Sequence, residues 1–169
     1  GLGDVYKRQA ESGQDWSPRF HDKCADMIPV DLNANLYGLE KDLSEWAELF
    51  EPEQAGAYEA AYKKRKELMD KYCLNADGTY HDYNYIENKQ NNVAFSGQFM
   101  PFVTGMLSDK NAAKSLLKKL FAAHGITSTE KCETHGAVYQ WAYPNSWAPD
   151  NYLAYESLKT VSYTHLRAH

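Results

Sequence analysis

The sequence predicts an all-α protein built of helical hairpins, with a short β-hairpin in one loop. Three observations support this prediction. Apolar residues recur at spacings of three and four along several segments, which is the period of a helix that packs on one side. Proline, glycine and Asn/Asp clusters separate these segments into pairs. One short stretch alternates in the manner of a strand, so sheet structure is expected to be minor.

The first pair of expected helices lies in the first half of the chain. One helix begins at Asp31, interpreted as its N-cap, and carries an apolar stripe of Leu32, Leu36, Leu39, Leu43, Trp46 and Phe50. Pro52 follows a break, and a second helix continues to about Tyr72, with one side formed by Tyr58, Ala61, Tyr62, Arg65, Leu68, Met69 and Tyr72. The basic run at 63–66 on this second helix is interpreted as a solvated face.

The rest of the chain repeats the pattern with longer loops. Residues 80–85 alternate and predict a short strand or hairpin. A third helix is expected over Gly97–Met106, with Pro101 inside it. A fourth is expected over Asp109–Ala123, capped by Ser108 or Asp109, with an apolar stripe of Ala113, Leu116, Leu117, Leu120 and Phe121. Pro149 stands where the first-turn proline of a last helix is expected.

The two ends of the chain differ from the rest. Asp4–Gln9 and Val161–His165 can both be encoded by one short DNA element read on opposite strands. That element resembles the transposon-end adapter of shotgun sequencing libraries. We therefore expect residues 1–9 and 161–169 to be translated adapter, and residues 10–160 to be a segment cut from a longer reading frame.

Composition excludes several classes of function. Without the tails, 15 Lys and Arg residues stand against 22 Asp and Glu residues, a net charge of −7. This acidic balance argues against nucleic acid or an anionic membrane as a partner, and no apolar run is long enough to span a bilayer. Oligomeric state leaves no signal in the sequence.

Cysteine and histidine usage gives no indication of a metal or cofactor. The three cysteines are widely spaced and form no CxxC pair, and no histidines have the spacing of metal ligands. We expect the cysteines to be reduced and mostly buried, which points weakly to the cytoplasm. No metal and no cofactor are expected.

Aromatic residues make up 14% of the chain. Tyr and Trp present a flat apolar face and a polar tip. Sugar rings pack their C–H faces on such aromatics, and their hydroxyls bind carboxylates and amides. An acidic, aromatic-rich and metal-poor composition therefore favours a carbohydrate site, and long loops are where such sites usually lie.

The first candidate loop is residues 11–20, "ESGQDWSPRF". Gly13 lets the backbone pass close to a ligand. Asp15 stands beside Trp16, and a carboxyl against an aromatic wall has a raised pKa, as a general acid needs. Arg19 nearby acts in the opposite direction. The alternative interpretation is an Asp15–Arg19 surface ion pair in a capped loop.

The second candidate loop is residues 140–149, "QWAYPNSWAP". Its two prolines stiffen the backbone, so aromatics on it lose little entropy when they bind a ligand. Trp141 and Trp147 would form a stacking wall for a sugar ring. The alternative interpretation is that these aromatics pack into the core. Both could hold, with one Trp stacking on the sugar and the other packing in the core.

Three motifs in order resemble the trehalase family, glycoside hydrolase family 37. They are "ESGQDWSPRF", "IPVDLNANLYGLEKDL" and "YQWAYPNSWAP", and the family patterns are close to ESGWDFSPRW, PVDLN and QWDYPNGWAP. The likeness runs across nearly all of residues 11–160 and is far more specific than any one motif.

The resemblance implies a fold, a reaction and site residues. It implies a partial (α/α)6 toroid over residues 10–160 and an inverting hydrolysis of α,α-trehalose to two glucoses. The aspartate of the first motif is the family's general acid and corresponds to Asp15. Sugar-binding positions carry over to Gly13 and Trp141, with Gln140 and Arg19 as further pocket residues. Asn33 of the middle motif is interpreted as structural.

Departures from the family pattern keep alternatives open. Gln14 replaces a usual Trp, Ala142 replaces a usual Asp, and Ser146 replaces a common Gly. The missing carboxylate at 142 leaves open a related toroidal glycosidase acting on another glucoside or mannoside. A non-catalytic carbohydrate-binding protein is the third alternative.

In the trehalase family the second catalytic carboxylate lies well downstream of the third motif. We therefore expect it to lie beyond residue 160 of this sequence. Inversion needs this base to activate water. We therefore expect the isolated segment to be inactive, to expose apolar helix faces and to aggregate.

Overall fold

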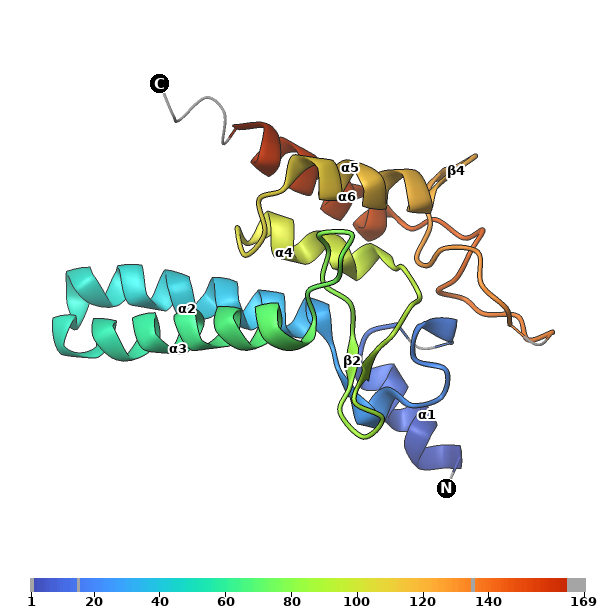
Figure 1. Cartoon of the computed structure of the whole chain (residues 1–169), viewed down its shortest axis with the longest axis horizontal. Helices are drawn as coiled ribbons and strands as arrows, with labels where there is room; N and C mark the ends of the chain where they lie inside the picture. The colour runs from blue at the N-terminus through green and yellow to red at the C-terminus, as the bar shows by residue number, and fades with distance from the viewer. Residues whose placement is uncertain (1, 15, 135, 164–169) are drawn as a thin grey trace.

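The computed structural model describes residues 2–14, 16–134 and 136–163, and shows two helical groups with a small sheet beside them (Figure 1). Helices α2 (Val30–Phe50) and α3 (Pro52–Tyr72) form an antiparallel hairpin that extends away from the rest of the chain. Helices α4 (Met100–Val103), α5 (Lys110–Leu120) and α6 (Ala148–Tyr163) form the second group. The order of elements confirms the mainly helical class, with minor strands.

The α2–α3 hairpin is held by a narrow buried seam. The seam includes Val30, Ala34, Tyr37 and Met69, all at most 9% exposed. Tyr37 also packs edge-on against Tyr62, with ring centroids 5.5 Å apart. Small residues on this side of α2 let the two helices approach, and the aromatic pair fills the wider part of the interface.

The other side of α2 carries large apolar side chains that are exposed. Five of its residues each have more than half of their surface accessible to solvent: Leu32, Leu39, Trp46, Leu49 and Phe50. Four of these residues belong to the stripe expected from the sequence. The exposure agrees with the expectation that helix faces of this segment lack partners.

The second helical group has its own core. Helix α5 begins after Asp109, whose side chain accepts hydrogen bonds from the backbone N–H groups of Asn111 and Ala112. The 3-10 helix η3 (Ser96–Phe99) leads directly into α4. The buried cluster comprises Ala94, Phe99, Phe102, Ala112, Ala113, Leu116, Leu120, Ile126, Ala154 and Val161.

A three-stranded antiparallel sheet lies beside the two groups, which contact each other directly through α2 and α4. Strand β1 (Met27–Ile28) pairs with β2 (Tyr83–Asn84), which pairs with β3 (Lys89–Gln90). The β2–β3 hairpin confirms the strand expected around residues 80–85. A second, two-stranded ladder joins β4 (Phe121–Ala122) to β5 (Gly125–Ile126).

Several local predictions were wrong in detail. Asp31 is not the N-cap of α2, because Pro29 takes that position and Asp31 lies in the first turn. The fourth helix ends at Leu120 rather than Ala123, because the chain turns into the β4–β5 ladder. The third helix is split into η3 and the single turn α4, with Pro101 in the first turn of α4 rather than inside a helix.

Residues 11–29 contain more structure than the sequence indicated. Two 3-10 helices, η1 (Pro18–Phe20) and η2 (Cys24–Asp26), precede strand β1. Helix α1 (Leu2–Glu11) precedes them, and α6 continues past residue 160, where Val161 is 2% exposed. The assignment of both tails to translated adapter stays a prediction.

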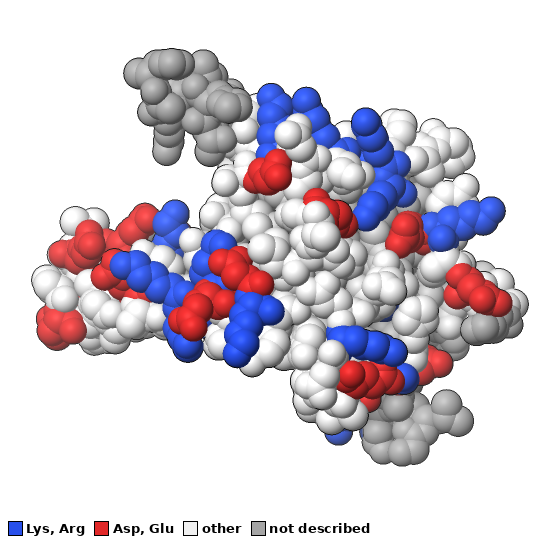
Figure 2. Space-filling model, viewed as in Figure 1, with Lys and Arg blue, Asp and Glu red and all other residues white. Residues whose placement is uncertain are grey.

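Acidic and basic side chains are interspersed on the face seen in Figure 2. The basic run on α3 is solvated as expected: Lys63 and Lys64 are exposed and pair with Glu59 and Glu67 of the same helix. Arg65 differs, because it turns towards α2 and forms a bidentate pair with Glu40.

Candidate active site

The two loops singled out from the sequence meet in the structure. The backbone N–H of Trp141 donates a hydrogen bond to the carbonyl oxygen of Trp16 at 3.1 Å. Residues 11–20 (the first loop) therefore lie against residues 140–149 (the second loop). Asp15 lies outside the described residues. Its neighbours Gln14 and Trp16 are both described and belong to this junction.

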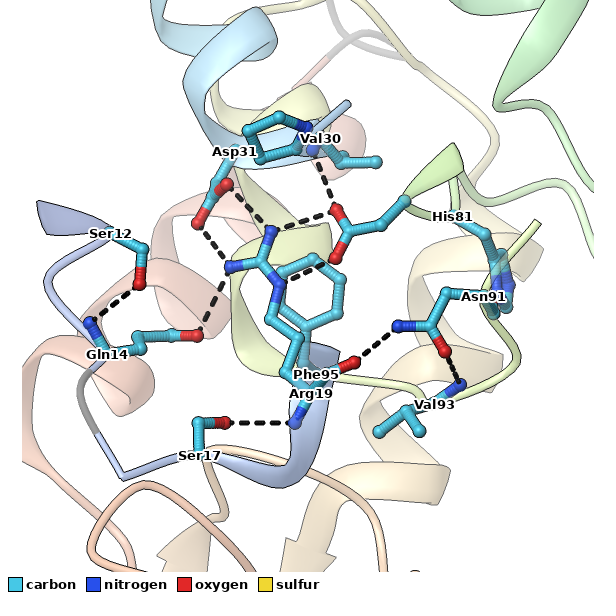
Figure 3. A network of polar contacts seen from close by, with 12 residues as sticks. Ser12, Gln14, Ser17, Arg19, Val30, Asp31, His81, Asn91, Val93 and Phe95 are labelled. Carbon is cyan, nitrogen blue, oxygen red and sulfur yellow. Dashed lines mark hydrogen bonds and ion pairs between the residues drawn. The ribbon is translucent and has the colours of Figure 1, made fainter. Parts of the chain in front are cut away.

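Arg19 is the centre of a buried polar network (Figure 3). Its side chain is 0% exposed. Nε and Nη2 donate to the carboxylate of Asp82 at 2.7 and 2.8 Å. Nη1 and Nη2 donate to Asp31 at 2.8 and 2.9 Å, and Nη1 also donates to the side-chain oxygen of Gln14 at 3.2 Å. These five contacts match the five N–H donors of a guanidinium.

Aromatic rings enclose the guanidinium of Arg19. Its central carbon lies 3.5 Å from the ring centroid of Phe95 and 4.4 Å from that of Phe20. This arrangement excludes the surface ion pair considered from the sequence, because Arg19 is not at the surface. The expected sugar contact of Arg19 stays a prediction, but a buried guanidinium with all donors engaged favours a positioning role.

The carboxylates of the network offset the cost of burying Arg19. Burial lowers the pKa of Arg19, but Asp31 and Asp82 outweigh burial and leave that pKa above its ordinary value. Burial likewise raises the pKa of Asp31, but Arg19 outweighs it and holds that pKa below the ordinary value. The charged states of Arg19 and Asp31 are therefore the stable ones at neutral pH.

Asp82 and Asp31 were not predicted to lie at this site. Asp82 is fully buried and also accepts a hydrogen bond from the backbone N–H of Val30 at 2.8 Å, which fixes the start of α2. Its signal in the sequence was an acidic residue inside an aromatic, strand-like segment. Gly97 lets η3 approach Asp31, since a Cβ there would lie 2.9 Å from Asp31 Oδ2.

The second loop presents a pair of stacked indoles. The rings of Trp141 and Trp147 lie 5.0 Å apart with 26° between their planes. Trp147 Nε1 donates to the backbone oxygen of Gln140 at 3.3 Å, and the Gln140 residue itself is exposed. Both indoles are partly buried, so they serve packing and still present surface to a ligand.

Gly13 and Ala142 are the two small residues of the site. Gly13 has φ +74° and its backbone is open, since a Cβ would meet nothing within 4 Å. The glycine is therefore required by backbone conformation rather than by space. Ala142 is 3% exposed. A family-type aspartate at 142 would place its carboxylate in this buried setting.

Among the described residues, no group of three or more His, Cys, Asp or Glu side chains could hold a metal ion. The cysteines of this part of the chain are all unpaired, and burial raises the pKa of Cys73 to about 12. In the described ranges no helix combines the length and the apolar character that crossing a bilayer requires.

Curated proteins similar to this chain are trehalases. The cytosolic neutral trehalase of Neurospora crassa is 32% identical over 88% of this chain and 24% of its own length. The periplasmic trehalase of Xanthomonas campestris is 29% identical over 92% of this chain and 29% of its own length. The chain thus spans roughly a quarter of these relatives, which include proteins of both compartments.

Solved structures give the same result for the fold. The neutral trehalase Nth1 from Saccharomyces cerevisiae superposes with a TM-score of 0.78 at 26% identity, over 89% of this chain and 31% of that one. A GH63 mannosylglycerate hydrolase from Thermus thermophilus superposes with a TM-score of 0.68 at 17% identity, over 99% and 40%. The expected partial (α/α)6 toroid is confirmed. The sequence model of the trehalase family matches residues 4–169, and the chain belongs to that family.

Proposed function

We propose that the full-length protein containing this chain is an inverting glycoside hydrolase that cleaves α,α-trehalose into two glucoses, with Asp15 as the general acid. The observation that carries the proposal is the hydrogen bond between Trp16 and Trp141. It joins the loop of the acid to the loop of the stacking aromatics, in a chain of the trehalase family. This contact supports a single site that combines the proposed acid with the proposed sugar platform.

The proposed reaction transfers two protons: one from the acid to the leaving oxygen, and one from water to the base. The Asp15 carboxyl donates its proton to the glycosidic oxygen as the bond to the anomeric carbon breaks. Water attacks that carbon from the opposite face and gives its proton to a second carboxylate, about 6.5–9.5 Å from the acid. In the proposal this base comes from sequence beyond the described residues.

The charge balance around Arg19 supports the acid role. A cation four residues from Asp15 would favour the ionised carboxylate. Here the charge of Arg19 is more than matched by Asp31 and Asp82. Arg19 therefore has little net attraction left to lower the pKa of a neighbouring acid. Gly13, Gln140 and Trp141 are proposed to line the sugar site.

Asp15→Asn in the full-length enzyme tests the acid. We expect kcat for trehalose to fall by about 10²–10⁴, because the leaving oxygen loses its proton donor, while sugar binding measured by calorimetry changes little. Asp42→Asn, which makes the same change at an exposed residue of α2 outside the site, is the matched control and should retain the activity. Unchanged kcat in Asp15→Asn would show that the acid lies elsewhere.

Product stereochemistry tests inversion independently. Proton NMR at early times should show α- and β-glucose in equal amounts, because the attacked ring inverts and the leaving ring does not. A retaining enzyme would release α-glucose from both rings. Absence of hydrolysis with intact sugar binding would favour a non-catalytic binding protein.

A related toroidal glycosidase with another substrate is the second candidate. Ala142 favours it, because the carboxylate usual in the family beside the stacking Trp is absent. A panel of α-glucosides and mannosides, assayed by release of the monosaccharide, distinguishes the two. Preference for any of them over trehalose would replace the first proposal.

We also infer a cytoplasmic location, supported by the unpaired cysteines at 24, 73 and 132. Fractionation of cells that produce the full-length protein tests this location. Recovery in a periplasmic or secreted fraction would contradict it.

A further inference from the structure

We propose that Asp150 is the positioning residue that fixes the place of the Trp141–Trp147 pair relative to the first loop. It does so through hydrogen bonds from Ser96 and Ser128, which we call the Asp150 clamp. The importance of this pair for sugar binding rests on the proposed function above. The geometry of the clamp itself does not depend on that function.

The Asp150 carboxylate is buried in the first turn of α6. The residue is 2% exposed. Oδ1 accepts a hydrogen bond from Ser96 Oγ at 2.7 Å, and Oδ2 accepts one from Ser128 Oγ at 2.7 Å. The backbone N–H of Trp147 also donates to this carboxylate. Three separate segments therefore converge on one side chain.

Packing alone does not explain the clamp, because burying a carboxylate costs free energy that an apolar side chain would not. In the described part of the chain, Asp150 forms no ion pair with a Lys, Arg or His side chain. Burial raises the pKa of Asp150, and the hydrogen bonds from Ser96, Ser128 and Trp147 only partly oppose this. An apolar residue would fill the same space without the cost of burying a carboxylate. What the carboxylate adds is direction, because each oxygen orients one hydroxyl.

One side of the clamp leads to the first loop. Ser96 follows Phe95, whose ring lies under the guanidinium of Arg19. The backbone N–H of Ser96 donates to the carbonyl oxygen of Ser128 at 2.9 Å, so the two serines lie side by side. Arg19 in turn binds the side chain of Gln14 in the first loop.

The other side of the clamp leads to the indoles. Trp147 lies three residues before Asp150, and its backbone oxygen accepts from Asn151 Nδ2 at 2.8 Å. Its ring stacks on Trp141, which is bonded through its backbone to Trp16 of the first loop. A closed circuit of contacts thus runs through Asp150, the indole pair, the first loop and back.

A helix-dipole role alone would not need this geometry. A carboxylate in the first turn stabilises a helix even from an exposed position, because it lies near the positive end of the helix dipole. Asp150 is instead buried, and its two oxygens reach side chains of other elements. We therefore expect its loss to move the indole pair more than it unwinds α6.

Stacked indoles give an exciton-coupled signal in far-ultraviolet circular dichroism, which reports on the pair directly. Trp147→Phe in this chain assigns the signal, because it removes one indole and leaves an aromatic ring. We then expect Asp150→Ala to lose most of the exciton signal while the helical signal remains. The matched control is Glu156→Ala, which removes a half-buried carboxylate from the same helix and should keep both signals.

Weaker variants cover the case in which Asp150→Ala does not fold. Ser96→Ala and Ser128→Ala each remove one hydrogen bond, and each should reduce the exciton signal in a folded chain. An exciton signal kept in folded Asp150→Ala, or in both serine variants, overturns the proposal. Loss of the helical signal in all three variants also overturns it, because the residues would then support the fold in general.

A kinetic measurement on the full-length enzyme separates the clamp from the proposed function. Asp150→Ala should raise KM for the sugar substrate more than it lowers kcat, because the platform moves while the acid and base remain. An unchanged KM would contradict the link to sugar binding. If the protein proves not to hydrolyse sugars, the circular dichroism result still decides whether the clamp positions the indoles.

Discussion

The α2–α3 hairpin and the two-loop site are stabilised in different ways. The hairpin is regular, its seam is formed by small and apolar residues, and its ion pairs lie at or near the surface. The site is irregular, and buried charges and hydroxyls hold it together around Arg19 and Asp150. A hairpin of this kind tolerates polar changes, whereas the site depends on each partner of its buried network.

The largest expected difference comes from breaking the Arg19 network. Asp82→Leu leaves a buried guanidinium with one carboxylate and removes the acceptor of the Val30 N–H. We expect a loss of about 3–5 kcal/mol in the free energy of unfolding, because breaking a buried ion pair leaves N–H donors of Arg19 and Val30 buried without that acceptor. Urea unfolding of the chain measures it. A loss below about 1 kcal/mol would mean that the network is not the main support of the site.

The pH dependence of stability gives the next effect. Arg19 holds the pKa of Asp31 below its ordinary value. The unfolded chain therefore binds this proton more readily, and the stabilisation present at neutral pH is lost as pH falls through the lowered pKa. Urea unfolding between neutral pH and pH about 3 should show this loss. Asp31→Asn should be less stable at neutral pH and should show a shallower acid dependence. An unchanged slope would contradict the assignment.

A comparable ion pair in the hairpin should matter less. Glu40→Gln removes the charge that Arg65 contacts, but both side chains are partly accessible to solvent. We expect a loss of about 1 kcal/mol or less in the free energy of unfolding. The same urea titration applies. A loss as large as that of Asp82→Leu would contradict the view that the site depends on its ion pairs more than the hairpin does.

The smallest effect on stability is expected on the exposed face of α2. Leu49→Gln changes a side chain that is 75% exposed, so the free energy of unfolding should change by no more than about 0.5 kcal/mol. Light scattering should show less aggregation, because the apolar face is interrupted. A marked destabilisation would show that Leu49 is packed in solution.

The two regions also differed in how well the sequence predicted them. The hairpin followed from its periodicity: α2 begins two residues earlier than expected, and α2 and α3 end at Phe50 and Tyr72 as expected. For the site, the sequence identified both loops and the family, but not the partners of Arg19. Asp82 lies 63 residues from Arg19 in the chain, and nothing in local periodicity indicates that they are paired.

The sequence by itself determined the long helical segments, the order of the motifs and the residues proposed for chemistry. These features depend on local spacing and on residue identity, which a chain carries in any conformation. Only the tertiary structure decided which face of α2 is buried, that Arg19 is enclosed rather than open to a ligand, and that Asp150 joins three segments. The physical reason is that burial and hydrogen bonding of charged groups depend on residues brought together from distant parts of the chain.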